Sequence, residues 1–188
     1  MSDPAATVHA YTYDGLGRGT DDAIVAGGGN IDLTVYKITR GYDDHLRLAK
    51  VTSIGKDGSG NDDPKNEVGF AYNAYGQRTS DIQEHAGEVA GGSRRVGYLY
   101  HNGSQNTTRR EGMVFPDGDI LGYGYEGTAA DKLSRINRLT LGGNGLCEYA
   151  YLGLGTAVTT RYLDLAATPA TVAVGTFADG GTGDAGVV

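Results

Sequence analysis

Aromatic and polar residues alternate at intervals along the chain, and this alternation predicts β-strands. Tyrosine pairs with one intervening residue stand at Tyr11/Tyr13, Tyr98/Tyr100, Tyr123/Tyr125 and Tyr149/Tyr151. Successive side chains of a strand point to opposite faces, so we expect both rings of a pair on one face. Tyr42, after Gly41, and Tyr72, two residues after Phe70, mark two related positions.

The second aromatic residue of each position recurs with a nearly fixed period. Successive members are 29, 30, 28, 25 and 26 residues apart; they are Tyr13, Tyr42, Tyr72, Tyr100, Tyr125 and Tyr151. A period in this range is typical of repeat architectures, in which each repeat contacts its neighbours. The sequence therefore predicts about six repeated units over residues 1–165.

A short polar stretch with glycine follows the aromatic residues, and it predicts a turn. Asp and Asn bond their own backbone, and Gly adopts positive φ without steric cost. A β-branched run such as Val51-Thr52 then follows, so each unit is predicted to be a β-hairpin. The residues of this repeat motif are Tyr11, Tyr13, Asp14, Gly17, Arg18, Tyr42, Asp43, Tyr72, Asn73, Gly76, Tyr98, Tyr100, Tyr123, Tyr125, Tyr149, Tyr151 and Gly155.

The second half of the chain carries the clearest hairpin signals, such as Phe115-Pro116-Asp117-Gly118. We predict antiparallel strands near 94–100, 106–115, 119–125, 135–141, 146–151 and 156–163. Residues 127–134 lengthen one turn and are predicted to form a helical turn. Segments 27–30 and 55–66 are predicted to be long polar connections. Residues 166–188 are predicted to hold one strand, 170–177, and a Gly/Ala-rich tail.

Composition changes this picture in one respect, the thickness of the core. The chain has 188 residues with 32 Gly, 13 Tyr and no Trp, and Leu, Ile, Val and Phe make up just under a fifth. Gly costs about 1 kcal/mol relative to Ala inside a helix, which argues against a helical bundle. The glycines fit hairpin turns, and the low aliphatic content predicts a thin sheet held by tyrosines and main-chain pairing.

Charge, apolar runs and cysteine content argue against several classes of protein. The net charge is −7 and the pI is near 5.0, which argues against nucleic-acid binding. The pairs Arg94-Arg95 and Arg109-Arg110 are interpreted as solvated strand positions. No apolar run approaches the roughly 20 residues of a membrane helix, so we expect no membrane span. Cys147 is the single cysteine, which excludes an intrachain disulfide, and the first residues lack the pattern of a signal peptide.

These repeats resemble the YD-repeat, or RHS-repeat, family. The matching text is Tyr11-Thr-Tyr13-Asp14-Gly15-Leu16-Gly17-Arg18, with weaker echoes at the later tyrosines; the Asp of the signature recurs only at Asp43. The resemblance implies hairpins joined into a curved or spiralling meander sheet in a large secreted or surface protein. In bacterial toxins of the family this sheet forms a hollow shell, and in teneurins it is an adhesion scaffold. The Asp-Pro and Gly-Leu pattern of self-cleaving members is absent.

The sequence offers few candidate residues for catalysis or for binding a metal. No histidine pair has metal-ligand spacing, and the sequence contains neither a Gly-x-Ser-x-Gly elbow nor a P-loop. Asp57, Asn61 and Asp63 offer oxygen ligands for Ca²⁺, against the alternative of a solvated loop. Asn102 and Asn106 match the N-glycosylation pattern, against the alternative of ordinary turn residues.

Three functions are compatible with these observations, and none needs a cofactor. The first is a non-enzymatic structural protein, extracellular or at the cell surface. Open sheet edges would join it to copies of itself in a filament, or to the rest of a larger RHS protein. The second is a carbohydrate-binding or adhesion module that uses exposed tyrosines, whose rings would otherwise pack against neighbouring hairpins. The third is an enzyme, for which the sequence places no acid–base pair.

Overall fold

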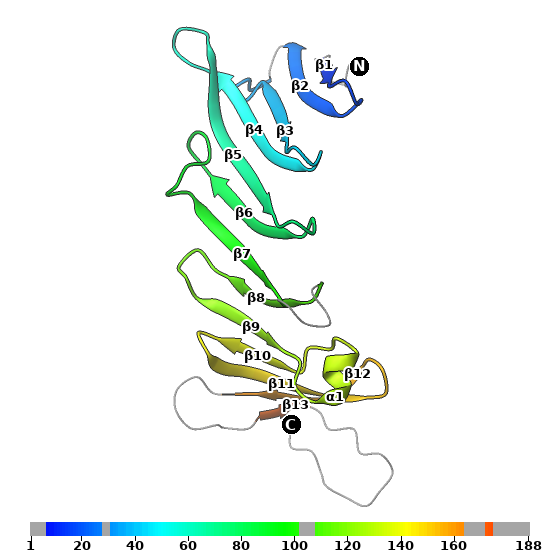
Figure 1. Cartoon of the computed structure of the whole chain (residues 1–188). Coiled ribbons are helices and arrows are strands. Elements are labelled where there is room, and N and C mark those ends of the chain that lie inside the picture. Colours follow the sequence, from blue (N-terminus) through cyan, green and yellow to red (C-terminus); the bar gives the residue numbers. More distant parts are fainter. Residues whose placement is uncertain (1–6, 28–30, 102–107, 164–171, 175–188) are drawn as a thin grey trace, which may run out of the picture. The chain divides into compact units, whose positions relative to one another are not determined.

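The computed structural model is an all-β protein whose neighbouring strands run antiparallel, which confirms the predicted fold class. It describes residues 7–27, 31–101, 108–163 and 172–174. The chain divides into two compact units, Met1–Val96 and Gly97–Val188 (Figure 1).

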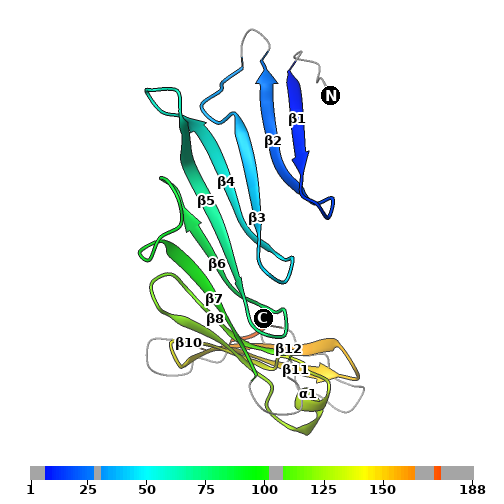
Figure 2. The same ribbon diagram turned by 45° about the horizontal axis from the view of Figure 1, so that its top comes forward.

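The first unit is a meander in which each strand pairs with the next along the chain. Its strands are β1 (Val8–Tyr13), β2 (Gly19–Ala26), β3 (Lys37–Tyr42), β4 (Leu48–Lys56), β5 (Asp62–Tyr72) and β6 (Arg78–Glu84). Among the described residues β1 pairs only with β2, and Figure 2 shows it as the outermost strand of this unit.

The second unit repeats this chain-order pairing. Its strands are β7 (Arg94–Tyr100), which crosses the boundary between the units, β8 (Arg110–Val114), β9 (Ile120–Gly124), β10 (Arg138–Leu141), β11 (Asn144–Leu152), β12 (Thr156–Tyr162) and β13 (Val172–Val174). The short helix α1 (Thr128–Lys132) lies between β9 and β10, as predicted for residues 127–134. The strands match the predicted ranges, although β8 and β10 begin later than expected.

One turn geometry recurs between the strands. In the first hairpin the N–H of Asp14 donates to the carbonyl of Arg18 at 2.9 Å, and the N–H of Gly17 donates to the carbonyl of Asp14 at 3.0 Å. Gly17 has a φ of 80°, so a residue in the left-handed region closes the loop. The same pair of bonds begins at Asp43, Asp57, Asn73 and Phe115.

The strand register shifts immediately before the tyrosine at each of five hairpin ends. These shifts fall at Thr12/Tyr13, Gly41/Tyr42, Ala71/Tyr72, Leu99/Tyr100 and Ala150/Tyr151. A β-bulge of this kind re-aims the side chain beside it. The extra residue lies on the strand that follows the turn, as Thr20 does between the partners of Thr12 and Tyr13.

The predicted long connection over residues 55–66 is wrong. The strand β4 continues to Lys56 and β5 begins at Asp62, so the connection is only the recurring turn that starts at Asp57. Asp57 supplies the turn-closing oxygen and Gly60 the left-handed residue, with a φ of 86°. The acidic and glycine content that suggested a solvated loop is the composition this tight turn requires.

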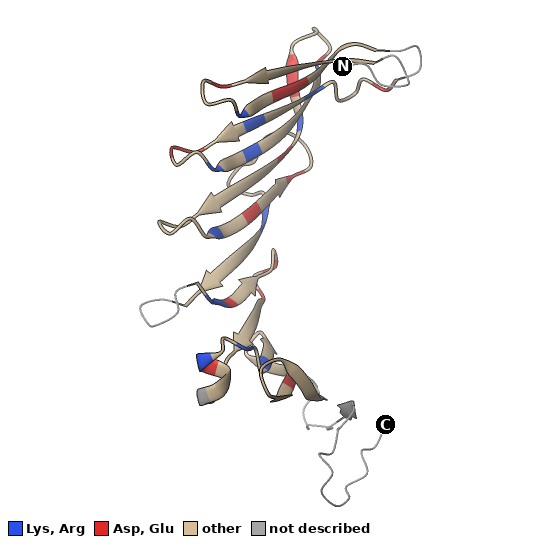
Figure 3. Ribbon diagram, turned by 90° about the vertical axis from the view of Figure 1, so that its right-hand side faces the viewer, with Lys and Arg blue, Asp and Glu red and all other residues tan. Residues whose placement is uncertain are grey.

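The described part of the chain buries few side chains. The buried hydrophobic residues are Ile54, Ala130 and Cys147, while Thr52 and Glu67 are buried polar residues. Acidic and basic residues are mixed along the ribbon and are not separated by sign (Figure 3). This burial agrees with the predicted thin sheet, and it leaves much of the packing to half-buried tyrosines.

Candidate functional site

The first residue of the recurring turn closes the loop with its side chain. Asp14 Oδ1 accepts hydrogen bonds from the backbone N–H of Leu16 and of Arg18, at 2.9 and 3.0 Å. Asp14 Oδ2 accepts a third bond from Nε of Arg18 at 2.6 Å. Asp43 and Arg47 repeat this arrangement, with Nε of Arg47 donating to Asp43 Oδ2 at 2.7 Å. The turn thereby fixes the arginine four residues after the aspartate.

These bonds keep the turn carboxylates ionised. The backbone hydrogen bond from Arg18 lowers the pKa of Asp14, and the guanidinium of Arg18 lowers it further. Desolvation would raise the pKa of Asp43, but hydrogen bonds from Arg47 and from the N–H of His45 outweigh it and lower that pKa as well. Both carboxylates therefore act as acceptors at neutral pH rather than as proton donors.

Each of these turn arginines covers a tyrosine ring of the next hairpin. The guanidinium carbon of Arg18 lies 4.2 Å from the centroid of the Tyr42 ring. That of Arg47 lies 4.5 Å from the centroid of the Tyr72 ring. The arginine side chains are 26% and 25% exposed, so the stacked pairs are largely withdrawn from solvent. A guanidinium over an aromatic face at this distance is a cation–π contact.

The tyrosine hydroxyl completes the link between hairpins. Tyr42 donates to the carbonyl of Gly19 and Tyr72 to the carbonyl of Leu48, each at 2.9 Å. In both cases the acceptor is the residue directly after the stacked arginine. We call the arginine stack and this hydroxyl bond together the arginine–tyrosine contact.

The second unit contains the same contact twice. Arg109 lies 4.1 Å from the centroid of Tyr125, whose hydroxyl donates to the carbonyl of Arg110 at 2.8 Å. Arg135 lies 4.6 Å from the centroid of Tyr151, whose hydroxyl donates to the carbonyl of the next residue, Ile136, at 2.5 Å. The arginine–tyrosine contact therefore does not depend on a Tyr-Asp dipeptide, which these turns lack.

The predicted solvation of the Arg109-Arg110 pair is wrong for Arg109, whereas Arg110 is exposed on β8 as expected. The side chain of Arg109 is only 10% exposed, and its Nη1 also donates to Asp131 Oδ1 at 2.7 Å. The guanidinium of Arg110 lies 4.3 Å from the centroid of Tyr98. Both arginines are packed on rings. The sequence signal that could have identified the first-unit arginines is the recurrence of Arg four residues after Asp14 and Asp43.

The remaining motif residues have varied surroundings. Tyr100 lies 6.0 Å from the guanidinium of Arg110, and Tyr123 is half-buried on β9. Contact with the Cys147 thiol, together with burial, raises the pKa of Tyr149 to about 12. Gly155 lies in the exposed turn between β11 and β12.

Three tyrosines of the first unit are exposed. Tyr11 and Tyr13 on β1 are 47% and 64% exposed, and Tyr75, within the turn that starts at Asn73, is 78% exposed. The four tyrosines of the arginine–tyrosine contacts are half-buried, which fits the packing interpretation for those rings. Sugar stacking needs an accessible ring face, which these three tyrosines and Tyr162, 51% exposed in the second unit, could offer.

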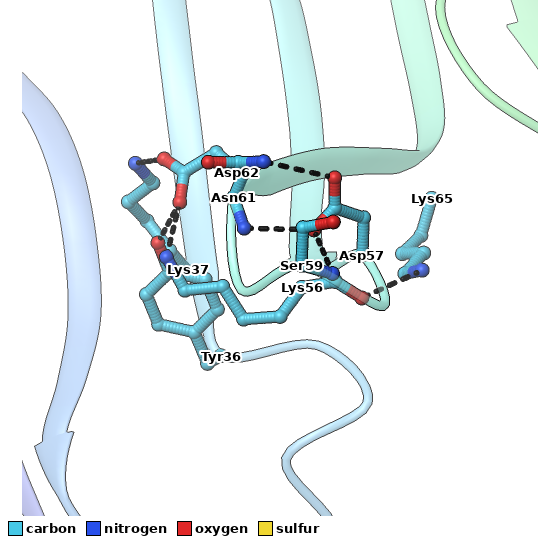
Figure 4. Close-up of polar contacts among 8 residues, drawn as sticks. All are labelled: Tyr36, Lys37, Lys56, Asp57, Ser59, Asn61, Asp62 and Lys65. Carbon is cyan, nitrogen blue, oxygen red and sulfur yellow. Dashed lines mark hydrogen bonds and ion pairs between the residues drawn. The ribbon is translucent and has the colours of Figure 1, made fainter.

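The strongest cluster of charged groups surrounds Asp62 at the start of β5 (Figure 4). Asp62 Oδ1 accepts from the hydroxyl of Tyr36 and from Nζ of Lys56, the latter at 2.6 Å. Asp62 Oδ2 accepts from Nζ of Lys37 at 2.5 Å. Both ammonium groups also lie near the Tyr36 ring, at 5.7 Å for Lys37 and 4.6 Å for Lys56.

The protonation states of this cluster favour structure over catalysis. The hydrogen bond from Lys37, followed by that from Lys56, lowers the pKa of Asp62 far below its usual range. The same bonds raise the pKa values of Lys37 and Lys56. A lysine nucleophile or base needs a lowered pKa, so neither lysine is prepared for that chemistry. The cluster instead ties β3, β4 and β5 together.

The predicted calcium ligands are engaged with the protein itself. Asp57 Oδ1 accepts the backbone N–H groups of Ser59 and Asn61, both at 2.8 Å, and Oδ2 accepts Nδ2 of Asn61 at 3.2 Å. Asp63 Oδ2 pairs with Nζ of Lys65 at 2.6 Å. Within the described residues, no group of three or more His, Cys, Asp or Glu is arranged to hold a metal ion.

Glu67 on β5 is the most deeply buried carboxylate among the described residues of the first unit, with 4% exposure. Its Oε2 accepts from the hydroxyl of Thr52 at 2.5 Å and lies 3.1 Å from Nζ of Lys50, and its Oε1 accepts the N–H of Val89 at 3.2 Å. Burial alone would raise the pKa of Glu67, but these partners outweigh burial and lower it. Glu67 is thus a buried, ionised carboxylate that bonds β5 to β4.

Comparison with known proteins does not add a family assignment. The chain matches no protein-family model and no curated protein.

None of the helices in the described ranges has the length and apolar character to cross a membrane. The glycosylation candidates Asn102 and Asn106 lie outside the described residues.

Proposed function

We propose that the chain is a non-enzymatic structural protein, a β scaffold of YD-repeat hairpins at the cell surface or outside the cell. The arginine–tyrosine contact carries this proposal, because it links one hairpin to the next four times in the described part of the chain. A repeated link of fixed chemistry is the feature that a modular array requires, since each repeat is stabilised by its neighbours.

The titratable groups support a structural role. Asp62 and Glu67 have lowered pKa values, while Lys37 and Lys56 have raised pKa values, so all four stay charged near neutral pH. Active sites usually shift pKa values toward the working pH, in the opposite direction. These groups therefore serve as fixed ion pairs between strands.

The scaffold would extend through its open edges. Two forms of assembly fit, a filament of copies and a larger RHS-type shell to which the hairpins of this chain contribute. Sedimentation velocity and negative-stain microscopy over a range of concentrations distinguish them. A filament predicts elongated particles that grow with concentration, whereas discrete single chains at every concentration would exclude it.

A matched pair of variants tests whether β1 is the joining edge. Tyr11→Lys places a charge on β1, which opposes pairing with a further strand. Leu16→Lys places the same charge at the tip of the first turn, where the side chain is already 66% exposed. Assembly through β1 should be lost in the first variant and kept in the second, and the opposite pattern would argue against this edge.

A carbohydrate-binding or adhesion module is the second candidate, favoured by the exposed ring of Tyr75. This ring is 78% exposed at the tip of a turn, where it takes no part in the arginine–tyrosine contacts. A glycan-array screen tests this role directly. Saturable binding to a glycan that Tyr75→Ala abolishes would support it, and a screen without binding would remove it.

A further inference from the structure

Tyr13 occupies the position of the linking tyrosines, but no arginine of the described residues lies over it. It directly precedes the turn residue Asp14, as Tyr42 precedes Asp43 and Tyr72 precedes Asn73. Tyr42 and Tyr72 are half-buried beneath arginines, whereas Tyr13 is 64% exposed. The first hairpin therefore presents one half of an arginine–tyrosine contact.

The backbone around Tyr13 matches that of the next hairpin. The strands β1 and β3 are both 6 residues long, and both shift register directly before their last tyrosine. The turns that follow them have the same two backbone bonds. In the next hairpin the corresponding strand and tyrosine already have a partner in the chain, because β2 pairs with β3 and Arg18 covers Tyr42.

We propose that the β1 edge with Tyr13 is a docking surface for a β-hairpin whose turn ends in an arginine. The strand after that arginine would pair antiparallel with β1. The register follows from the pairing of β2 with β3, in which Asp21, Asp22 and Ala23 face Thr39, Ile38 and Lys37. The residues three, four and five positions after the partner's arginine would thus face Ala10, His9 and Val8. The arginine would cover the Tyr13 ring, whose hydroxyl would donate to the next carbonyl.

A folded second copy of this chain is a poor occupant, because its turn arginines are already engaged. Arg18, Arg47, Arg109 and Arg135 all lie on rings of their own chain. The turn between β11 and β12, the last in the described part of the chain, has Thr156 where the first turn has Arg18. The chemistry of the edge therefore points to a hairpin with an uncommitted turn arginine, outside the folded chain.

The proposal rests on the proposed scaffold only in requiring that β1 be a joining edge. The probe is a fluorescent peptide of residues 8–26, which contains Arg18 and is the hairpin that meets Tyr42 in the folded chain. Val8→Cys and Ala26→Cys in the peptide allow a disulfide that holds it as a hairpin, because these two residues are cross-strand partners. The full chain is titrated into the peptide, and fluorescence anisotropy reports binding.

We expect saturable binding that depends on both halves of the contact. Arg18→Ala in the peptide, or Tyr13→Ala in the chain, should weaken binding about tenfold. The two changes together should weaken it no more than either alone, because they remove the same contact. Tyr13→Phe keeps the ring and should cost only about threefold, the loss of one hydroxyl bond. Leu16→Ala in the peptide and Tyr75→Ala in the chain are the matched controls and should leave affinity unchanged.

Two results would overturn the proposal. One is the absence of saturable binding to the unaltered chain, and the other is equal binding of the Arg18→Ala peptide. Circular dichroism of the Tyr13 variants confirms that they remain folded. Sedimentation of the chain alone measures separately whether copies of the chain join one another. If the peptide fails while copies still join through β1, the docking proposal falls and the scaffold stands; if the peptide binds while copies stay single, the docking proposal stands and only the filament form of the scaffold falls.

Discussion

The contact between Arg47 and Tyr72 offers the clearest energetic test, because both side chains can be truncated separately and together. The guanidinium lies 4.5 Å from the ring centroid, and the Arg47 side chain is 25% exposed. Arg47→Ala also removes the bonds to Asp43 and to the carbonyl of Asn73. A double-mutant cycle with Tyr72→Ala cancels these losses, since they occur in both backgrounds.

The coupling energy follows from the burial of the pair. Cation–π contacts contribute about 0.5–1 kcal/mol at exposed sites and about 2 kcal/mol when desolvated. A pair that is three-quarters withdrawn from water should lie between these limits, so we expect a coupling of about 1 kcal/mol. Tyr72→Phe keeps the stack and removes only the bond to Leu48, so it should destabilise the first unit by about 1 kcal/mol.

Urea unfolding followed by circular dichroism measures each free energy of unfolding. The matched control replaces Tyr72→Ala with Tyr75→Ala, which truncates an exposed ring on the same turn. The Arg47 coupling to Tyr75 should be near zero. A coupling to Tyr72 no larger than that to Tyr75 would refute the claim that the stack joins the two hairpins.

Three further predictions concern the turns and the buried carboxylate. Leu46 has a φ of 66° where the other turns of the first unit have glycine, so Leu46→Gly should stabilise the protein by about 1 kcal/mol in urea unfolding, while Leu16→Gly should not. A Cβ on Gly55 would collide with a backbone carbonyl, so Gly55→Ala should lower the melting temperature and cost about 1–3 kcal/mol, whereas Gly58→Ala meets open space and should be neutral. The pKa of Glu67 is lowered on folding, so its contribution to stability is present above the unfolded pKa of about 4.3 and is lost as the pH falls. Glu67→Gln should therefore flatten the acid limb of a stability–pH profile, and an unchanged slope below that pH would contradict this assignment.

The local features of the fold could be predicted from the sequence because they depend on short-range chemistry. The period of the tyrosines located the hairpins, and Asp14, Asp43 and Asn73 identified turns that their own side chains close. The Asp57 turn was missed, since no tyrosine precedes it and its acidic text resembles a loop that binds cations. Leu46 gives no sign in the sequence that it adopts a left-handed conformation, which the turn imposes on it.

The candidate site depended on contacts that the sequence does not reveal. The arginines recur in the sequence, but their tyrosine partners lie 24 residues away for Arg18 and 16 residues away for Arg109. Which ring meets which guanidinium is set by the pairing of the strands. The Asp62 cluster likewise forms only because β3, β4 and β5 lie side by side.

Whether consecutive hairpins are joined by an arginine over a tyrosine ring is tested most directly by NMR of the arginine side chains in the full chain. Protons held above an aromatic ring are shifted upfield by its ring current. We expect upfield-shifted δ protons for Arg18, Arg47, Arg109 and Arg135, and Tyr72→Leu should return only those of Arg47 to ordinary values. Ordinary shifts for all four arginines in the unaltered protein would contradict the arginine–tyrosine contact as the link between hairpins.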